Sequence, residues 1–227
     1  MEIPSPEIPK TGRRFAIPDI HGCPKTLLAL LKQIGPNEDD QVFFLGDYVN
    51  KGPDSQGTLD FLISLSEKPN YHFIRGNHDQ LLLDHLKGEN LLPPEKIKKL
   101  NIQSFDQRGN YDQYISFIEA SVYYLNLDQF LLVHAGFDFS SENAFDDTQR
   151  MMNIVGFSYN DKLANHKTIV HGHLPLPLET IEMKIQNQER ILPLDNGCVY
   201  LGERPGHGNL LALDLDSKEM FKQKRID

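Results

Sequence analysis

Six side chains of types that commonly bind metal ions follow short apolar segments of the sequence. They are Asp19, His21, Asp47, Asn77, His134 and His173. Asp19 and His21 stand two positions apart in DIHG, so in an extended segment both point to the same side. The set offers oxygen and nitrogen donors and no thiolate. This donor chemistry suits two divalent metal ions such as Mn²⁺, Fe²⁺ or Zn²⁺, with Asp47 bridging them.

Each of these residues, taken alone, also has an ordinary structural explanation. An Asp that follows a strand is often a helix cap or a turn former. The ordered set is harder to explain in this way, because each buried polar side chain without a partner would cost free energy. We therefore interpret the set as a metal site.

Five apolar segments lead to these residues and are typical of buried strands. They read RRFAIPDI, DQVFFLGD, YHFIRGN, FLLVHAG and KTIVHGH. Between the first three lie CPKTLLALLKQI and SQGTLDFLISLSEK, whose apolar residues recur at the three- and four-residue spacing of a helix. The pattern predicts a β-α-β-α-β unit in which consecutive strand ends meet at one edge of a sheet.

The rest of the chain is predicted to belong to the same domain. We expect one domain over residues 1–227, with residues 81–126 forming a polar, helical cap inserted into it. After His173, the segments 180–186, 190–197, 198–202 and 209–216 alternate between apolar and polar residues and are separated by turn residues. This pattern favours an antiparallel sheet at the C-terminal end.

The composition is that of a globular protein and excludes several function classes. Hydrophobic residues make up 39% of the 227 and charged residues 24%, and the formal net charge is −9. A net negative charge repels phosphate polyanions, so we do not expect nucleic-acid binding as a general function. No apolar run is long enough to cross a bilayer, and two cysteines are too few for a disulfide framework. We expect no membrane partner and a cytoplasmic location.

The ordered motifs DIHG, GDYVNKG, GNHD, HAG and GH resemble those of the calcineurin-like metallophosphoesterases. Within that family they are similar to the phosphoprotein phosphatases, which are serine/threonine phosphatases, and to the bacterial symmetrical diadenosine tetraphosphate hydrolases. The resemblance runs from about Arg14 to Asp216. It implies an α/β fold: a β-sandwich flanked by helices in α-β-β-α layers, with a small helical cap insertion.

The resemblance also implies a role for each residue. The first metal ion would be bound by Asp19, His21 and Asp47, and the second by Asp47, Asn77, His134 and His173. Lys51 and Asn77 would bind the substrate. The implied mechanism is direct attack of a metal-bound hydroxide on phosphorus, with His78 protonating the leaving oxygen and Asn50 as its partner.

The sequence departs from the phosphatase pattern at the loop GDxVDRG, where Asn50 and Lys51 replace Asp and Arg. We expect the Asn50 carbonyl to accept the imidazole N–H of His78, without the charge that would raise the pKa of the imidazole. Lys51 keeps a positive charge and loses the bidentate fork of Arg. Bacterial relatives often carry a phosphate-binding Trp-x-Arg element. This chain has no Trp, and Arg150 is the candidate to replace that arginine.

Three functions are compatible with these residues. The first is a metal-dependent phosphatase that acts on a phosphorylated protein or a small phosphoester. The second is a nucleotide hydrolase of the diadenosine tetraphosphate type, which the missing loop Asp favours. The third is a degenerate relative with low activity, which the substitutions at Asn50 and Lys51 favour.

Overall fold

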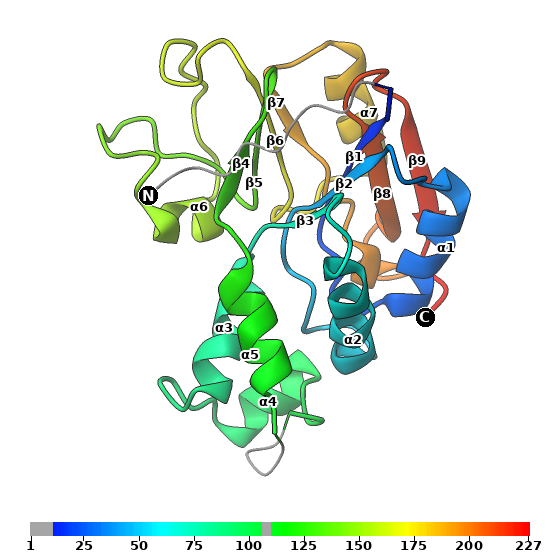
Figure 1. Ribbon diagram of the computed structural model, residues 1–227, viewed down its shortest axis with the longest axis vertical. Coiled ribbons are helices and arrows are strands. Elements are labelled where there is room, and N and C mark those ends of the chain that lie inside the picture. Colours follow the sequence, from blue (N-terminus) through cyan, green and yellow to red (C-terminus); the bar gives the residue numbers. More distant parts are fainter. Residues whose placement is uncertain (1–10, 106–109) are drawn as a thin grey trace.

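The first of two β-sheets contains the first and the last strand of the described residues. The computed structural model describes residues 11–105 and 110–227 (Figure 1). The strand order is β3 (Tyr71–Phe73), β2 (Gln41–Phe44), β1 (Arg14–Ile17), β8 (Asn209–Asp214) and β9 (Met220–Lys224). Strands β1, β2 and β3 are parallel, whereas β8 is antiparallel to both β1 and β9.

The second sheet has the order β4 (Tyr124–Asn126), β5 (Phe130–Val133), β6 (Thr168–His171) and β7 (Ile191–Pro193). Strands β5, β6 and β7 are parallel, and β4 is antiparallel to β5. The five strands predicted to lead to the site are therefore confirmed as β1, β2, β3, β5 and β6. All five run in parallel within their own sheets, so their carboxyl ends meet at one edge of each sheet.

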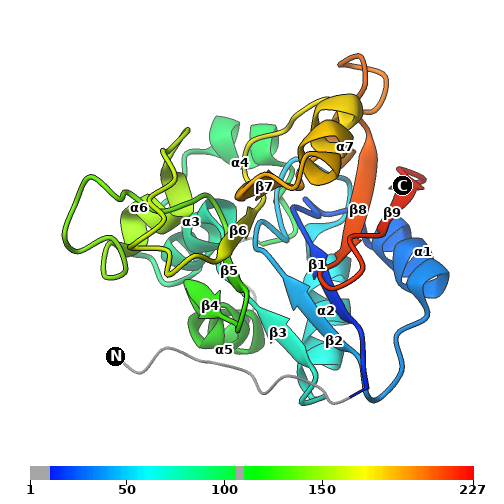
Figure 2. The same ribbon diagram turned by 90° about the horizontal axis from the view of Figure 1, so that it is seen from above.

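Alternation of side chains along the strands builds the layers. Phe15 and Ile17 of β1 pack with α1 (Pro24–Ile34) and α2 (Ser55–Ser66), while Ala16 between them faces the apolar core shared by the two sheets. The outer face of the second sheet packs against residues that include Met151 of α6 (Thr148–Asn153). Figure 2 shows this succession from α6 through the two sheets to α1. The predicted α-β-β-α sandwich is confirmed.

Three helices project away from the sheets (Figure 1). They are α3 (Asn77–Leu86), α4 (Pro94–Leu100) and α5 (Asp112–Ala120). They fall in the region expected to form the cap over 81–126, with two differences in its bounds. Helix α3 already begins at Asn77, and residues 124–126 form strand β4 of the second sheet.

The prediction of an antiparallel sheet after His173 is largely wrong. Residues 178–186 form helix α7 (Leu178–Gln186). Ile181 and Ile185 are four positions apart, so they fit one face of a helix as well as one face of a strand, and the sequence pattern does not distinguish the two. Strand β7 is parallel to β6, and Cys198–Tyr200 form a short 3₁₀ helix. Only β8 is an antiparallel strand within the segments named.

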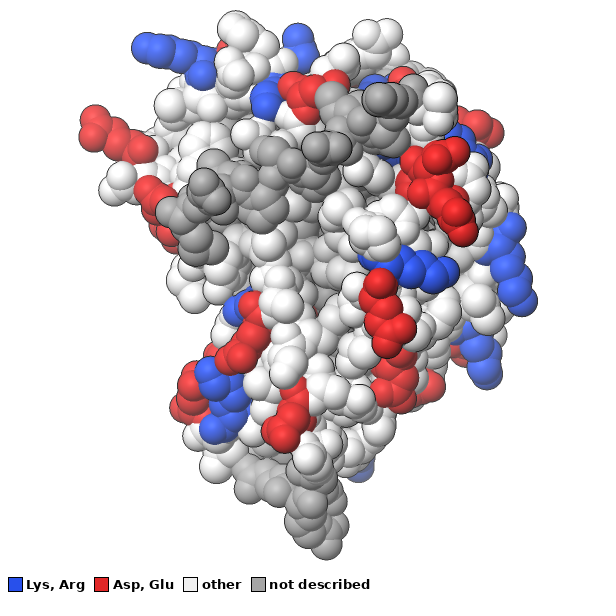
Figure 3. All heavy atoms as spheres, viewed as in Figure 1, with Lys and Arg blue, Asp and Glu red and all other residues white. Residues whose placement is uncertain are grey.

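The surface carries charges of both signs. Figure 3 shows Lys and Arg side chains interspersed with Asp and Glu on the face viewed there. None of the helices in the described part of the chain is both long enough and apolar enough to span a membrane.

Candidate metal centre

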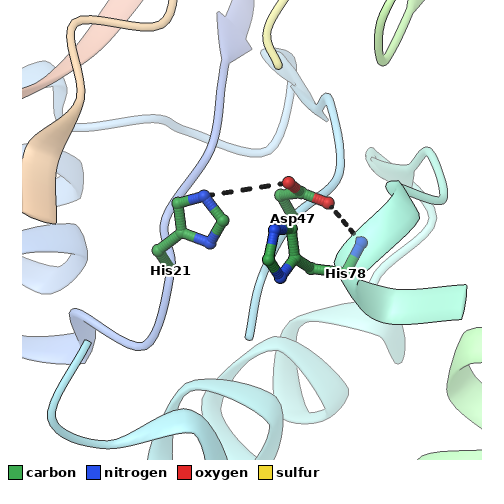
Figure 4. A group of neighbouring side chains, drawn as sticks. All are labelled: His21, Asp47 and His78. Carbon is green, nitrogen blue, oxygen red and sulfur yellow. Dashed lines mark hydrogen bonds and ion pairs between the residues drawn. The ribbon is translucent and has the colours of Figure 1, made fainter. Parts of the chain in front are cut away.

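The Asp47 carboxylate lies between two groups of potential metal ligands. Its Oδ2 is 3.7 Å from Nε2 of His21, which in turn is 3.7 Å from Oδ2 of Asp19. Its Oδ1 is 3.4 Å from Nε2 of His134. Figure 4 shows Asp47 together with His21 and with His78, whose backbone N–H donates to Oδ1 across 2.9 Å. One carboxylate is therefore in reach of two possible ion positions.

The second group is the tighter of the two. The Oδ1 atom of Asn77 is 3.1 Å from Nε2 of His134 and 3.2 Å from Nδ1 of His173, and the two imidazole nitrogens are 3.2 Å apart. The backbone N–H of His173 donates to Oδ1 of Asp19 across 2.8 Å, which ties the two groups together. The structure thus brings all six residues singled out as ligands into one cluster.

Backbone carbonyls set the direction of two imidazoles. The Nδ1 of His21 lies 2.9 Å from the carbonyl oxygen of Val49, and the Nδ1 of His134 lies 2.9 Å from that of Leu45. A carbonyl oxygen can only accept, so each Nδ1 carries the proton and each Nε2 presents a lone pair. Both lone pairs point into the cluster, as metal ligation requires.

The backbone of the cluster is held in an uncommon conformation. His21, Asp47, Asn50, Lys51 and His173 have φ angles of 48°, 54°, 72°, 67° and 68°. Residues with side chains seldom adopt such left-handed angles, and each instance costs on the order of 1–3 kcal/mol. Five such residues within one site indicate that the surrounding structure holds the loops in place for a purpose other than stability.

Two glycines allow the loops to approach the ligand carboxylates. A Cβ atom on Gly76 would lie 2.2 Å from Oδ1 of Asp47, and one on Gly172 would lie 2.2 Å from Oδ1 of Asp19. The φ of Gly76 is −94°, which any residue can adopt, so glycine is needed there for space, whereas Gly46, with φ of 97°, is needed for its backbone conformation.

Asp79, the last residue of GNHD, has a role that the sequence analysis missed. Its side chain is fully buried and accepts three backbone hydrogen bonds, from Gly76 at 2.9 Å, Asp47 at 2.8 Å and Tyr48 at 2.9 Å. The carboxylate therefore joins the Asp47 loop to the first turn of α3. The signal was available, since an acidic residue at the third position of a helix is typical of a capping box.

The electrostatics of the cluster favour cations. Burial raises the pKa of Asp47 to about 7, and burial together with the Asp47 charge raises that of Asp19 well above its usual range. Burial, together with the charge of Asp19, also raises the pKa of Asp195. Oδ2 of Asp19 is buried and has no hydrogen-bond partner among the described residues. Buried carboxylates with an unused oxygen fit a bound divalent cation.

The loop substitutions Asn50 and Lys51 both contact imidazoles. Nδ2 of Asn50 donates to Nδ1 of His78 across 2.9 Å and also approaches the His78 carbonyl oxygen at 3.3 Å. The expected direction was the reverse, with the Asn50 carbonyl accepting. The amide nitrogen faces the His78 carbonyl oxygen, which can only accept, and with Nδ2 donating to Nδ1 as well, the proton of neutral His78 lies on Nε2. Nζ of Lys51 donates to Nε2 of His21 across 2.8 Å.

Arg150, the candidate for the missing arginine, pairs with an acidic residue at the surface. It lies on α6, its side chain is 57% exposed, and its Nε is 3.6 Å from Oδ2 of Asp138. Its charge is therefore used at the surface.

Comparison with models of known protein families identifies the family of this chain. The model for calcineurin-like phosphoesterases matches residues 13–211, and the chain belongs to this family of metal-dependent phosphoester hydrolases. A relative from Legionella pneumophila (strain Lens), named bis(5'-nucleosyl)-tetraphosphatase, symmetrical, is 49% identical over 75 residues. That match covers 33% of this chain and 26% of the relative, so the chain spans about a quarter of the relative's length.

Other matches extend over nearly the whole chain. The asymmetrical bis(5'-nucleosyl)-tetraphosphatase PrpE of Bacillus subtilis (strain 168) is 24% identical over 222 residues, covering 84% of this chain and 88% of that protein. A solved structure described provisionally as a diadenosine tetraphosphatase superposes with a TM-score of 0.68 at 22% identity, covering 96% of each chain. A serine/threonine phosphatase from Saccharomyces cerevisiae superposes with a TM-score of 0.61 at 13% identity, covering 95% of this chain and 81% of that one. These structural likenesses establish the shared fold.

Proposed function

We propose that this protein hydrolyses a phosphoanhydride bond of a dinucleoside polyphosphate with the help of two divalent metal ions. The observation that carries the proposal is the position of Asp47, whose two carboxylate oxygens each face a different group of donors. Asp19, His21 and Asp47 would hold one ion, and Asp47, Asn77, His134 and His173 the other. Two bound ions supply positive charge that lowers the pKa of a water nucleophile and stabilises the phosphoryl oxygens.

His78 favours a good leaving group. Because Asn50 donates to Nδ1, the Nε2 proton of neutral His78 is the one directed away from Asn50, and it can hydrogen-bond to the departing oxygen. Asn50 carries no charge, so it gives no support to a second proton on the ring. The phosphate released from an anhydride is a far weaker base than the alkoxide released from phosphoserine, and it needs less proton transfer. The lower demand for proton transfer matches a His78 without a charged partner, and this match supports an anhydride substrate.

Relatives named as tetraphosphatases support the same substrate class. Hydrolysis of a phosphomonoester, the first function considered from the sequence, stays as the second candidate. It is favoured by Lys51, whose ammonium group contacts the ligand set and could bind a single phosphate group.

The test is an assay of metal-stripped protein that has been refilled with Mn²⁺. Three substrates are compared: diadenosine tetraphosphate, an aryl phosphate and a phosphoserine peptide. We expect the highest kcat/KM for the dinucleotide, and chromatography of its products distinguishes a symmetrical from an asymmetrical split. A preference for the phosphoserine peptide would replace the proposal with the second candidate, and turnover of none of the three would overturn both.

A further inference from the structure

Helix α4 lies against the loop that contains Asn50 and Lys51. The carbonyl oxygen of Leu100, the last residue of the helix, accepts a hydrogen bond from the backbone N–H of Lys51 across 2.8 Å. The side chain of the next residue, Asn101, donates through Nδ2 to the carbonyl oxygen of Gly52 across 2.6 Å. Two bonds therefore fix the C-terminal end of α4 beside the candidate metal centre.

The apolar residues of α4 show which side of the helix faces the rest of the molecule. Ile97 and Leu100 are half-buried and pack against the core. Lys96 lies four positions before Leu100 and so projects on the same side of the helix, whereas Lys98 lies on nearly the opposite side. Both lysines are exposed. The positive charge of Lys96 also contributes to the lowered pKa of His78, as the smallest cause after burial, Lys51, His134 and His173.

The charge of Lys96 is available for a ligand. Within residues 11–105 and 110–227, no ion pair involves Lys96 or Lys98. Lys51 and Lys96 thus place two cations near His78, one from the loop after β2 and one from α4. A phosphate chain carries further negative charges along its length, so a second cation beyond Lys51 can pair with a neighbouring phosphate group.

We infer that Lys96 binds a phosphate group next to the one attacked, so that α4 selects substrates with a phosphate chain over single phosphoesters. The inference rests on the proposed function and names the residue that sets its substrate class. Lys96 acts as a specificity residue: its ammonium forms a charge-assisted hydrogen bond to an oxygen of the neighbouring phosphate.

The experiment compares Lys96→Ala with Lys98→Ala in the Mn²⁺-loaded protein, using diadenosine tetraphosphate and an aryl phosphate. Loss of one charge-assisted hydrogen bond should raise KM for the dinucleotide by about 10- to 100-fold. KM for the aryl phosphate should change less than about twofold, as for any distant surface charge. Lys98→Ala, which removes the same charge from the other side of α4, should leave both substrates unaffected. Lys96→Arg should restore dinucleotide binding.

A second readout does not depend on turnover of the dinucleotide. Inorganic tripolyphosphate should inhibit aryl phosphate hydrolysis less strongly in Lys96→Ala than in the wild type, while inhibition by orthophosphate should be equal in both. If Lys96→Ala and Lys98→Ala behave alike, or if both substrates are affected equally, the role of Lys96 is overturned while the proposed function stands. If the wild type hydrolyses neither substrate, the proposed function itself fails.

Discussion

Asn50 donates a hydrogen bond through Nδ2 to Nδ1 of His78, across 2.9 Å. This relationship fixes the tautomer of an imidazole beside the candidate metal centre and leaves it without a negative partner. The serine/threonine phosphatases that the motifs resemble have an Asp at this position, so the chain differs from them at the group that would assist the leaving oxygen.

Asn50→Asp should therefore change the leaving-group preference. A carboxylate would accept the Nδ1 proton and raise the pKa of His78, because a nearby negative charge favours the imidazolium form. We expect kcat to rise more for a phosphoserine peptide than for an aryl phosphate, and the basic limb of the kcat profile to move to higher pH. The measurement is kcat for both substrates between about pH 6 and 9. Equal profiles for the two proteins would remove the proposed role of Asn50.

Gly172→Ala should weaken the first ion position. The new Cβ would lie 2.2 Å from Oδ1 of Asp19, so the carboxylate or the loop after β6 must move. We expect lower affinity for one of two Mn²⁺ ions in calorimetric titration. The free energy of unfolding of the metal-free protein serves as the control for folding. Two ions bound with wild-type affinity would contradict the placement of Asp19 in the centre.

Asp79→Ala should destabilise the fold and loosen the centre at the same time. It leaves three buried backbone N–H groups without their acceptor, at a cost of roughly 1–3 kcal/mol for each group that stays unpaired. Urea unfolding of the metal-free protein measures the loss. Ile185→Ala, which removes a half-buried apolar side chain from α7 in the core between the two sheets, provides a destabilised comparison. If the two variants lost Mn²⁺ affinity equally, Asp79 would have no specific role in positioning Asp47.

His72 should make the protein sensitive to acid independently of any metal. Burial lowers the pKa of His72 from 6.5 to about 4, and its Nε2 has no hydrogen-bond partner among the described residues. The folded protein therefore binds fewer protons than the unfolded chain between these values. The contribution of His72 to stability is full above about pH 6.5 and is lost as the pH falls towards 4.

His72→Phe keeps an aromatic ring against Phe43, whose centroid lies 4.9 Å away, and removes the titrating group. Urea unfolding at pH 7.5 and at pH 5 measures how much stability each protein loses between the two conditions. We expect a smaller loss for the variant, because its other titrating groups are the same. An identical loss would show that His72 takes up its proton equally well in the folded and unfolded states.

The strands that lead to the site were predictable, because apolar runs such as those before Asp47 and His134 end abruptly in a polar residue and a glycine. The helix at 180–186 was not predictable. The spacing of Ile181 and Ile185 fits both a strand and a helix, and the packing of α7 against the core decides between the two. The orientation of the Asn50 amide could not be predicted from the sequence either. It depends on the carbonyl oxygen of His78, which only the folded loop brings near.

The number of metal ions bound per chain, in the wild type and in Asp47→Asn, tests the central claim most directly. The two oxygens of Asp47 face two donor groups, and an amide keeps the shape of the side chain while losing the charge that would hold both ions. We predict that elemental analysis after Mn²⁺ loading and removal of free metal finds two ions per wild-type chain and fewer than two per variant chain, with turnover lost. A wild type that binds fewer than two ions, or a variant that keeps two ions and full activity, would contradict the account.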